Sequence, residues 1–321
     1  MTTNELPRTT GCPAGVFLPL ADSISTTIEK GNGLMHRILS ISIYAFASLI
    51  GVVAFLYPFF TLAQQTAASA TQQMAHGADS PLILALLIGL CLAALAVEAQ
   101  GQAMSAKLIA LLGILVAINT ALRFAEAVVR GPGGFSTVFM LIILCGYVFG
   151  PRFGFLMGIL SLFVSGIATG GVGPWLPYQM FTAGWMGMSA GWLGLLRTRT
   201  PGAGYLPQRR PALPSRIEVV VLCLFGALWG FVYGAIMNLW FWPFQAGDPA
   251  QSWQAGLTFV QGLQRYAAFY IATSFIWDAF AAIGNVALLS LFGMPTLKAM
   301  LRFKHRFMFT IDTRRALPSG A

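Results

Sequence analysis

The feature that most constrains this chain is the segment from Phe153 to Leu196, which contains no Asp, Glu, Lys or Arg. A membrane-spanning helix needs about 20 mainly apolar residues, so this segment has room for two crossings. Between them lies the turn sequence TGGVGPWLP, residues 169–177. The whole chain follows the same pattern, because 57% of its 321 residues are hydrophobic and only 9% are charged. The sequence therefore predicts a protein that crosses the bilayer several times.

Apolar segments bounded by glycine, proline or charged residues predict eight helices. They lie near residues 38–63, 81–98, 106–127, 135–149, 152–169, 177–196, 217–241 and 266–292. The expected fold is an all-α, polytopic membrane helix bundle. Its expected parts are a cytoplasmic N-terminal tail (1–37), two additional transmembrane helices (38–99), a core of six helices (100–293) and a basic cytoplasmic C-terminal tail (294–321).

The basic residues test this topology independently. With both termini in the cytoplasm, every Lys and Arg except Arg123, Arg130 and Arg265 falls on a cytoplasmic segment. That asymmetry is the one that the positive-inside rule describes. The net charge of +9 is therefore interpreted as topology and contact with anionic lipid, and no nucleic-acid partner is expected.

Motifs for catalysis and for metal binding are missing from the sequence. It contains no GxxxxGK[ST] and no HExxH, and its three histidines fall in predicted loops or tails. The four cysteines form no CxxC pair. No Ser-His-Asp group can be assembled within the membrane from these residues. We therefore expect no catalytic residue, no metal and no cofactor, and a protein that is not an enzyme.

The predicted helix 106–127 has two contrasting faces. One is polar and carries Asn119, Arg123, Glu126 and Arg130. These residues predict either a local ion pair near the interface or part of a ligand site, since ionisable groups in a span are costly. The opposite face is a stripe of small residues, which lets another helix approach closely. It serves either a contact within the bundle or docking of a separate subunit, and it consists of Ala106, Ala110, Gly113, Ala117 and Ala121.

A carboxylate lies within the last predicted helix. Asp278 shares one face of helix 266–292 with Tyr270, Ser274 and Asn285. An isolated carboxylate is costly at membrane depth, so it needs Arg123, a ligand cation or another hydrogen-bond donor as a partner, or a proton. The alternative is a hydrogen bond between helices.

Aromatic residues gather at the outer ends of two predicted helices. Trp175 and Tyr178 stand in GVGPWLPYQM, and Trp240 and Trp242 in MNLWFWPF. Aromatic residues at this level commonly form an interfacial belt. Here they stand beside Gly-Pro and Trp-Pro turns, and rigid aromatic loops over a polar cavity suit a planar, amphipathic ligand.

Two stretches resemble a known family. They are AINTALRFAEAVVRGPGGFSTVFMLIILCGYVFGPRFGFLMGIL and TGGVGPWLPYQMFTAGWMGMSAGWLG. They resemble the substrate-binding (S) component of energy-coupling factor (ECF) transporters, the vitamin importers of bacteria and archaea. The resemblance covers about residues 106–292 and implies a plasma-membrane protein of a prokaryote. Two further helices precede this region, a departure from the six-helix pattern of the family.

The resemblance implies a mechanism. Such subunits bind one vitamin near the outer face and dock through an AxxxA motif on their first helix. The docking partner is a transmembrane coupling subunit that carries two cytoplasmic ATPases. Ala106 and Ala110 match the docking motif by position, and Gly113, Ala117 and Ala121 continue the stripe.

The resemblance also implies a pocket formed by the first outer loop and the last three helices. The expected ligand-binding residues are Asn119, Arg123, Glu126, Trp175, Tyr178, Gln179, Asn238, Trp240, Trp242 and Asp278. The aromatic residues suggest a large ring system, with cobalamin as the first candidate; pyrimidine, thiamine-precursor and deazapurine ligands stay open. The alternative function is an ion-coupled secondary transporter or channel in which Asp278 is the coupling carboxylate. A membrane enzyme acting on lipid is disfavoured because no nucleophile or metal group is found.

Overall fold

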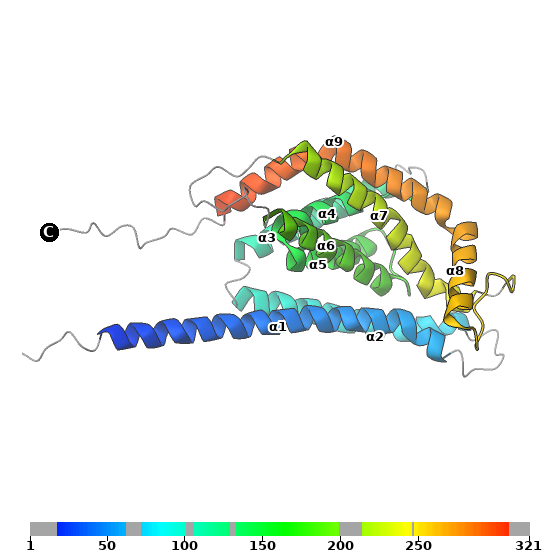
Figure 1. The fold of residues 1–321 in the computed structure, drawn as a ribbon, viewed down its shortest axis with the longest axis horizontal. Coiled ribbons are helices and arrows are strands. Elements are labelled where there is room, and N and C mark those ends of the chain that lie inside the picture. Colours follow the sequence, from blue (N-terminus) through cyan, green and yellow to red (C-terminus); the bar gives the residue numbers. More distant parts are fainter. Residues whose placement is uncertain are drawn as a thin grey trace, which may run out of the picture.

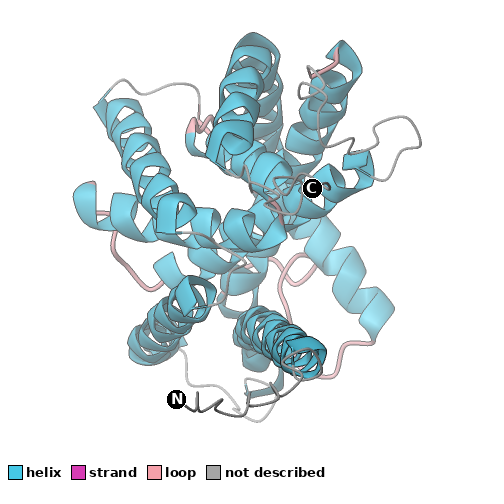
Figure 2. Cartoon of the chain, turned by 90° about the vertical axis from the view of Figure 1, so that its left-hand side faces the viewer, coloured by secondary structure: helices cyan, strands magenta, loops and turns pink. Residues whose placement is uncertain are grey.

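The computed structural model describes residues 18–61, 72–100, 106–128, 133–198, 214–245 and 247–307. These residues form helices and no strand, as Figure 2 shows, so the predicted all-α class is confirmed. Arg130 and the outermost parts of the two predicted tails lie outside the described residues. In chain order (Figure 1) the elements are α1 (Leu18–Thr61), α2 (Gln72–Gln100), α3 (Ala106–Val128), α4 (Val138–Phe149), α5 (Pro151–Ala168), α6 (Leu176–Thr198), α7 (Arg216–Phe241), the 3-10 turn η2 (Trp242–Phe244), α8 (Phe259–Thr273) and α9 (Phe275–Phe307).

Six of the described helices contain a segment that is long and apolar enough to cross a membrane. These helices are α1, α2, α3, α5, α7 and α9. The helix α4 is also apolar but has only 12 residues, and nearly all of them are buried. It lies with α6 between the other helices, where neighbouring helices rather than lipid cover its surface (Figure 1). The polytopic membrane bundle expected from the uncharged segment is therefore confirmed.

Glycine allows α5 and α6 to form the most extensive helix contact of the bundle. A Cβ atom added to Gly187 of α6 would lie 2.0 Å from the carbonyl oxygen of Gly154 in α5. The reverse substitution places a Cβ 2.1 Å from the oxygen of Gly187. In lipid, helices associate through close packing rather than through hydrophobicity, so such backbone contacts hold the centre of the bundle together.

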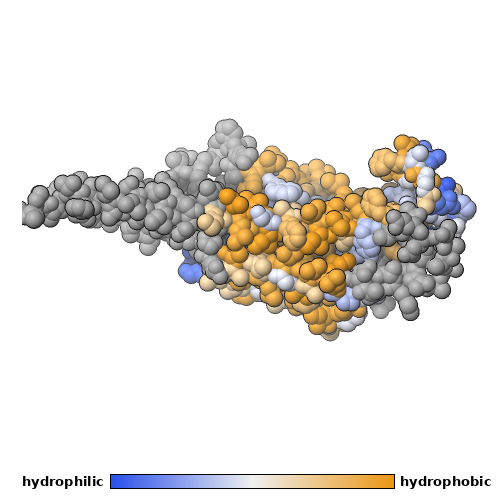
Figure 3. Space-filling view, turned by 90° about the horizontal axis from the view of Figure 1, so that it is seen from below, coloured by the Kyte–Doolittle hydropathy of each residue, from blue (hydrophilic) through white to orange (hydrophobic). Residues whose placement is uncertain are grey.

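The first two helices form a separate pair on one side of the bundle. They pack against each other and against α6, and they lie beneath the other helices in Figure 1. Their outward surface is largely apolar (Figure 3), with exposed side chains such as Phe46, Leu49 and Leu86. A face of this kind suits contact with lipid. We call α1 and α2 the accessory pair.

The last predicted helix is divided. Residues 266–292 were expected to form one helix, and that expectation is wrong, because α8 ends at Thr273 and α9 begins at Phe275. The chain turns sharply between them at Ser274 (Figure 1). Serine side chains compete with the backbone for hydrogen bonds and favour helix ends, and here the Thr273 and Ser274 hydroxyls pair with each other. As a result Asp278 lies in the first turn of α9 rather than deep within a span.

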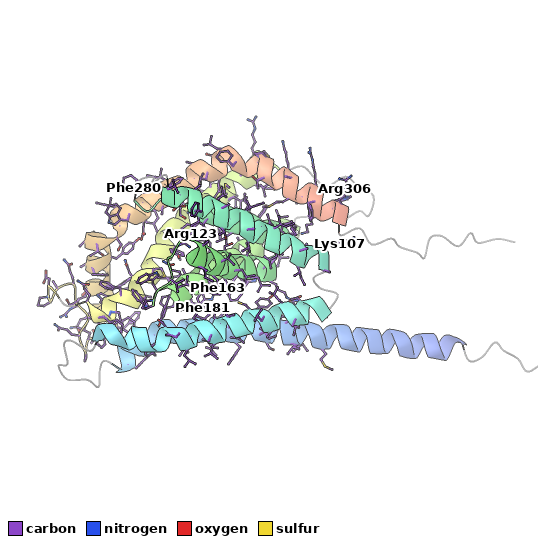
Figure 4. The ribbon with its side chains drawn as sticks, turned by 180° about the vertical axis from the view of Figure 1, so that it is seen from behind. Lys107, Arg123, Phe163, Phe181, Phe280 and Arg306 are labelled. Atoms are coloured by element: carbon purple, nitrogen blue, oxygen red, sulfur yellow. The ribbon has the colours of Figure 1, made fainter. Side chains whose placement is uncertain are left out.

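The two ends of the bundle differ in charge. Figure 4 shows Lys107 of α3 and Arg306 of α9 at one end, which we call the basic end. The start of α1 and the finish of α9 also lie on that side (Figure 1). Arg123 and Phe280 are nearer the opposite end, where residues 133–137 and 247–258 form loops. We call this the loop end. Which side of the membrane each end faces stays a prediction.

Candidate substrate-binding site

A cavity of about 320 Å³ lies at the loop end. It is bounded by the loop before α4, by α4 itself, by one turn of α6, by the second half of α7 and by the start of α9. The lining residues are Gly134, Phe135, Ser136, Phe139, Gln179, Gly230, Tyr233, Gly234, Met237, Asn238, Ser274, Trp277, Asp278 and Ala281. The walls therefore come from the first loop of the predicted core and its last helices, the region where the sequence places a pocket.

The loop before α4 closes one side of the cavity. Gly134 has a φ of 83°, a conformation that is costly for any residue with a side chain. A Cβ at Gly134 would also lie 2.0 Å from the carbonyl oxygen of Trp277, so the loop backbone rests directly on the first turn of α9. The ring of Phe135 lies in the same way against Gly284 of α9. Glycine at these contacts keeps the loop and α9 together.

Asp278 brings a carboxylate to the cavity. Its Oδ2 accepts a hydrogen bond of 2.8 Å from the hydroxyl of Tyr270, across the break between α8 and α9. The break also places Asp278 in the first turn of a helix, where the helix dipole favours a negative charge. Gly234 of α7 leaves the space that this carboxylate occupies, because a Cβ there would lie 1.9 Å from Oδ2.

Two amide side chains line the cavity with atoms that have no partner. In the part of the chain that the structure describes, Oε1 of Gln179 and Nδ2 of Asn238 are buried and make no hydrogen bond. Leaving a buried polar atom unpaired costs about 1–3 kcal/mol. The cavity wall therefore includes an acceptor from α6 and a donor from α7 that are buried and unpaired among the described residues.

Two residues of the polar face predicted on α3 form hydrogen bonds with the loop and the helix that border the cavity. Glu126 accepts hydrogen bonds from the backbone N–H of Thr137 (2.9 Å) and from the hydroxyls of Thr137 and Ser136. Asn119 donates to the carbonyl oxygen of Val138 at 3.2 Å. Both side chains thus fix the loop and the start of α4 without lining the cavity.

Arg123 makes neither of its predicted ion pairs. Its guanidinium donates to Oγ of Ser165 in α5 at 3.1 Å. Neither Glu126 nor Asp278 forms a salt bridge with it among the described residues. Arg123 thus ties α3 to α5, and it does not line the cavity.

The predicted aromatic residues do not line the cavity. Trp175 is 41% exposed, and its Nε1 donates to the carbonyl oxygen of Gly171. Tyr178 is fully buried and lies 6.1 Å, centroid to centroid, from the ring of Trp240. Trp242 is buried and donates to the carbonyl oxygen of Gln251 at 2.8 Å. These aromatic side chains pack the loop end of the bundle.

The aromatic walls of the cavity are residues that the sequence analysis missed. They are Phe135, Phe139, Tyr233 and Trp277, and the rings of Phe139 and Tyr233 are 4.7 Å apart. The sequence does contain a pattern that indicates this wall, because Gly230, Gly234 and Asn238 recur every four residues on the helix that carries Tyr233. Small and polar residues in a regular row mark the face of α7 that leaves room for a ligand.

The small-residue stripe on α3 is exposed on the surface of the described helices. All five of its residues are exposed, and a Cβ added to Gly113 would meet nothing within 4 Å. The buried face of the same helix carries Leu108, Leu112 and Leu115. The accessory pair leaves the stripe uncovered. Among the described residues, the stripe is therefore not a contact within this bundle. It consists of Ala106, Ala110, Gly113, Ala117 and Ala121.

Comparison with known protein families matches residues 107–300 to the family described as ECF transporter, substrate-specific component. The match covers more than half of the chain. The chain belongs to this family. It is a membrane-embedded transport component, as the resemblance implied. No curated protein and no solved structure matches it.

The match separates the ECF component proper from its accessory pair. It begins at the second residue of α3 and ends within α9, so α1 and α2 lie outside it. The cavity lies within the matched region, and so does the stripe apart from Ala106, which directly precedes it. Membership implies a small-molecule substrate and coupling to the other components of an ECF module.

Proposed function

We propose that this S component binds a vitamin in the cavity at the loop end and delivers it to an ATP-driven importer. The observation that carries the proposal is the pair of unpartnered buried atoms, Oε1 of Gln179 and Nδ2 of Asn238, in the cavity wall. Buried polar groups are normally paired. A ligand that forms hydrogen bonds with both atoms would remove the energetic cost of leaving them unpaired, and these bonds would fix the orientation of the ligand.

The volume of the cavity bears on the choice of vitamin. Clefts for small ligands span roughly 300 to 1,000 Å³, so a cavity of about 320 Å³ is at the small end. It suits a compact vitamin with a single or fused ring. Cobalamin, the first candidate from the sequence, carries a corrin ring and a nucleotide loop and is far larger. We therefore propose a smaller vitamin as the substrate.

The docking partner is a transmembrane coupling subunit with two cytoplasmic ATPases. The exposed stripe on α3 supports this assignment, because small residues allow a partner helix to approach closely. The membrane is the plasma membrane of a prokaryote. The basic end faces the cytoplasm, and so do both termini, since basic residues favour that side.

The experiment that tests this function is uptake in cells that express the chain with a coupling subunit and its ATPases. Accumulation of one radiolabelled vitamin must require the chain and must stop when the ATPases are inactivated by mutation. Accumulation that persists without active ATPases contradicts the proposal.

A second candidate is an ion-coupled transporter, favoured by the half-buried carboxylate of Asp278 in α9. Intramembrane carboxylates are common in ion pathways. In that case an uncoupler that collapses the proton or sodium gradient, rather than loss of the ATPases, stops uptake.

A further inference from the structure

Asp278 is the one side chain with a formal charge among the residues that line the cavity. No Lys, Arg or His is among them. Arg123, at the same end of the bundle, donates to Ser165 instead. The formal charge that a ligand meets directly is therefore a carboxylate, which favours a positively charged group and opposes a negative one, while the charge of Arg123 acts on Tyr233 from outside the lining.

The unpaired hydrogen-bonding groups in the cavity wall are two acceptors and one donor. Tyr270 occupies Oδ2 of Asp278, and Oδ1 has no partner among the described residues. Oε1 of Gln179 is a second unpaired acceptor and Nδ2 of Asn238 an unpaired donor; both are buried, so each amide turns toward the cavity to meet a ligand. A matching ligand presents N–H groups to the two acceptors and one acceptor atom to the donor.

The aromatic walls restrict the shape of the ligand. Phe135, Phe139, Tyr233 and Trp277 come from the loop, α4, α7 and α9, so rings stand on several sides of the cavity. Aromatic faces attract both planar rings and cations, and the attraction to a cation strengthens where water is excluded.

We propose that the ligand is a compact, planar nitrogen heterocycle whose amino-bearing or protonated edge faces Asp278. An amino group beside a ring nitrogen supplies N–H donors and an acceptor along one edge, which is the complement of Asp278, Gln179 and Asn238. A ligand that carries a carboxylate or phosphate is rejected, because it brings a second negative charge beside Asp278 in a half-buried site. This inference rests on the proposed function, in which the cavity is the substrate site.

The test is tryptophan fluorescence of the purified full-length chain, titrated with vitamins of contrasting charge. Thiamine presents an aminopyrimidine edge, whereas nicotinate, biotin and pantothenate carry a carboxylate. Saturable binding of an amino-bearing compound and no binding of the carboxylates is the expected result. Tight binding of a carboxylate overturns the inference and leaves the proposed function standing. No binding of any compound overturns both.

A variant identifies the group responsible. Asp278→Asn keeps the shape of the side chain and removes its charge, so affinity for the amino-bearing ligand is expected to fall about tenfold or more. The matched control is Asp248→Asn, in the loop before α8 and away from the cavity, with no expected change. Unchanged affinity in a folded Asp278→Asn protein overturns the inference. If this variant does not fold, the charge preference of the unmodified chain decides the question alone.

Discussion

Oε1 of Glu98 lies 3.1 Å from the guanidinium of Arg152, and the Glu98 side chain is only 1% exposed. Ser40 of α1 donates to the same oxygen. Three helices meet at this carboxylate: α1 and α2 of the accessory pair and α5 of the family core. The accessory pair is therefore joined to the core by a buried charge as well as by apolar packing.

Removing one partner of this pair is expected to destabilise the whole chain. Arg152→Met leaves the buried Glu98 charge without compensation, and such a loss costs about 3 kcal/mol. The measurement is the thermal unfolding midpoint in detergent. Arg302→Met, at an exposed position near the same end, is the control and should leave the midpoint unchanged. Adding Glu98→Gln to Arg152→Met should recover much of the loss, and a failure to do so would contradict the assignment.

The glycine contact between α5 and α6 gives a second prediction. Gly187→Ala forces a Cβ against the backbone of Gly154, and overpacking of this kind costs about 1–3 kcal/mol. Gly113→Ala is the matched control, because its new methyl group meets nothing. The thermal unfolding midpoint of Gly187→Ala should be clearly lower than that of Gly113→Ala. Equal midpoints would mean that α5 and α6 are not in backbone contact.

The exposed stripe on α3 predicts a loss of transport without a loss of binding. Ala117→Trp blocks close approach of a partner helix, so uptake should fall about tenfold or more in cells that hold the complete module. The affinity of the purified chain for its ligand should not change, because the stripe lies away from the cavity. Leu224→Trp, on the exposed surface of α7, controls for a bulky side chain in lipid. Normal uptake by cells that express Ala117→Trp would show that the stripe is not the docking surface.

Glu126 is expected to act through the loop that closes the cavity. Glu126→Ala removes three hydrogen bonds to Ser136 and Thr137, and leaving such part-buried groups unpaired costs about 1–3 kcal/mol in stability. Ligand affinity should fall with it, since Ser136 lines the cavity. Glu126→Gln keeps an acceptor oxygen and should retain most of both properties. If Glu126→Gln lost as much stability and ligand affinity as Glu126→Ala, the site would require the charge of Glu126 and not only its acceptor oxygen.

The fold was largely predictable because membrane crossings follow from composition. The segment 153–196 carries no charge, and its glycine and small residues became the tight contact of α5 with α6. The period of the small residues on α3 predicts that they share one face, but it does not tell whether that face is exposed or packed within the bundle. The break at Ser274 was not predictable, since one serine in an apolar run carries little signal and the turn depends on what α8 and α9 pack against.

Some of the residues predicted to bind the ligand line the cavity, and others lie around it. Gln179, Asn238 and Asp278 line the cavity, while Arg123 and Glu126 support it. The sequence shows which residues are polar at membrane depth. It does not show whether a polar group meets a neighbouring helix or an open space, because that depends on contacts between distant segments. Tyr233 and Trp277 were missed for the same reason.

The central claim is that the cavity binds the substrate, and direct titration tests it. Tryptophan fluorescence of the purified chain is measured against single vitamins, for the natural sequence, for Gln179→Leu and for the exposed-site control Gln264→Leu on α8. We predict saturable binding of one compact vitamin, weakened about tenfold by Gln179→Leu, the effect of one lost hydrogen bond in a buried site, and unchanged in the control. Absence of binding, or binding of equal strength in all three folded proteins, would contradict the claim.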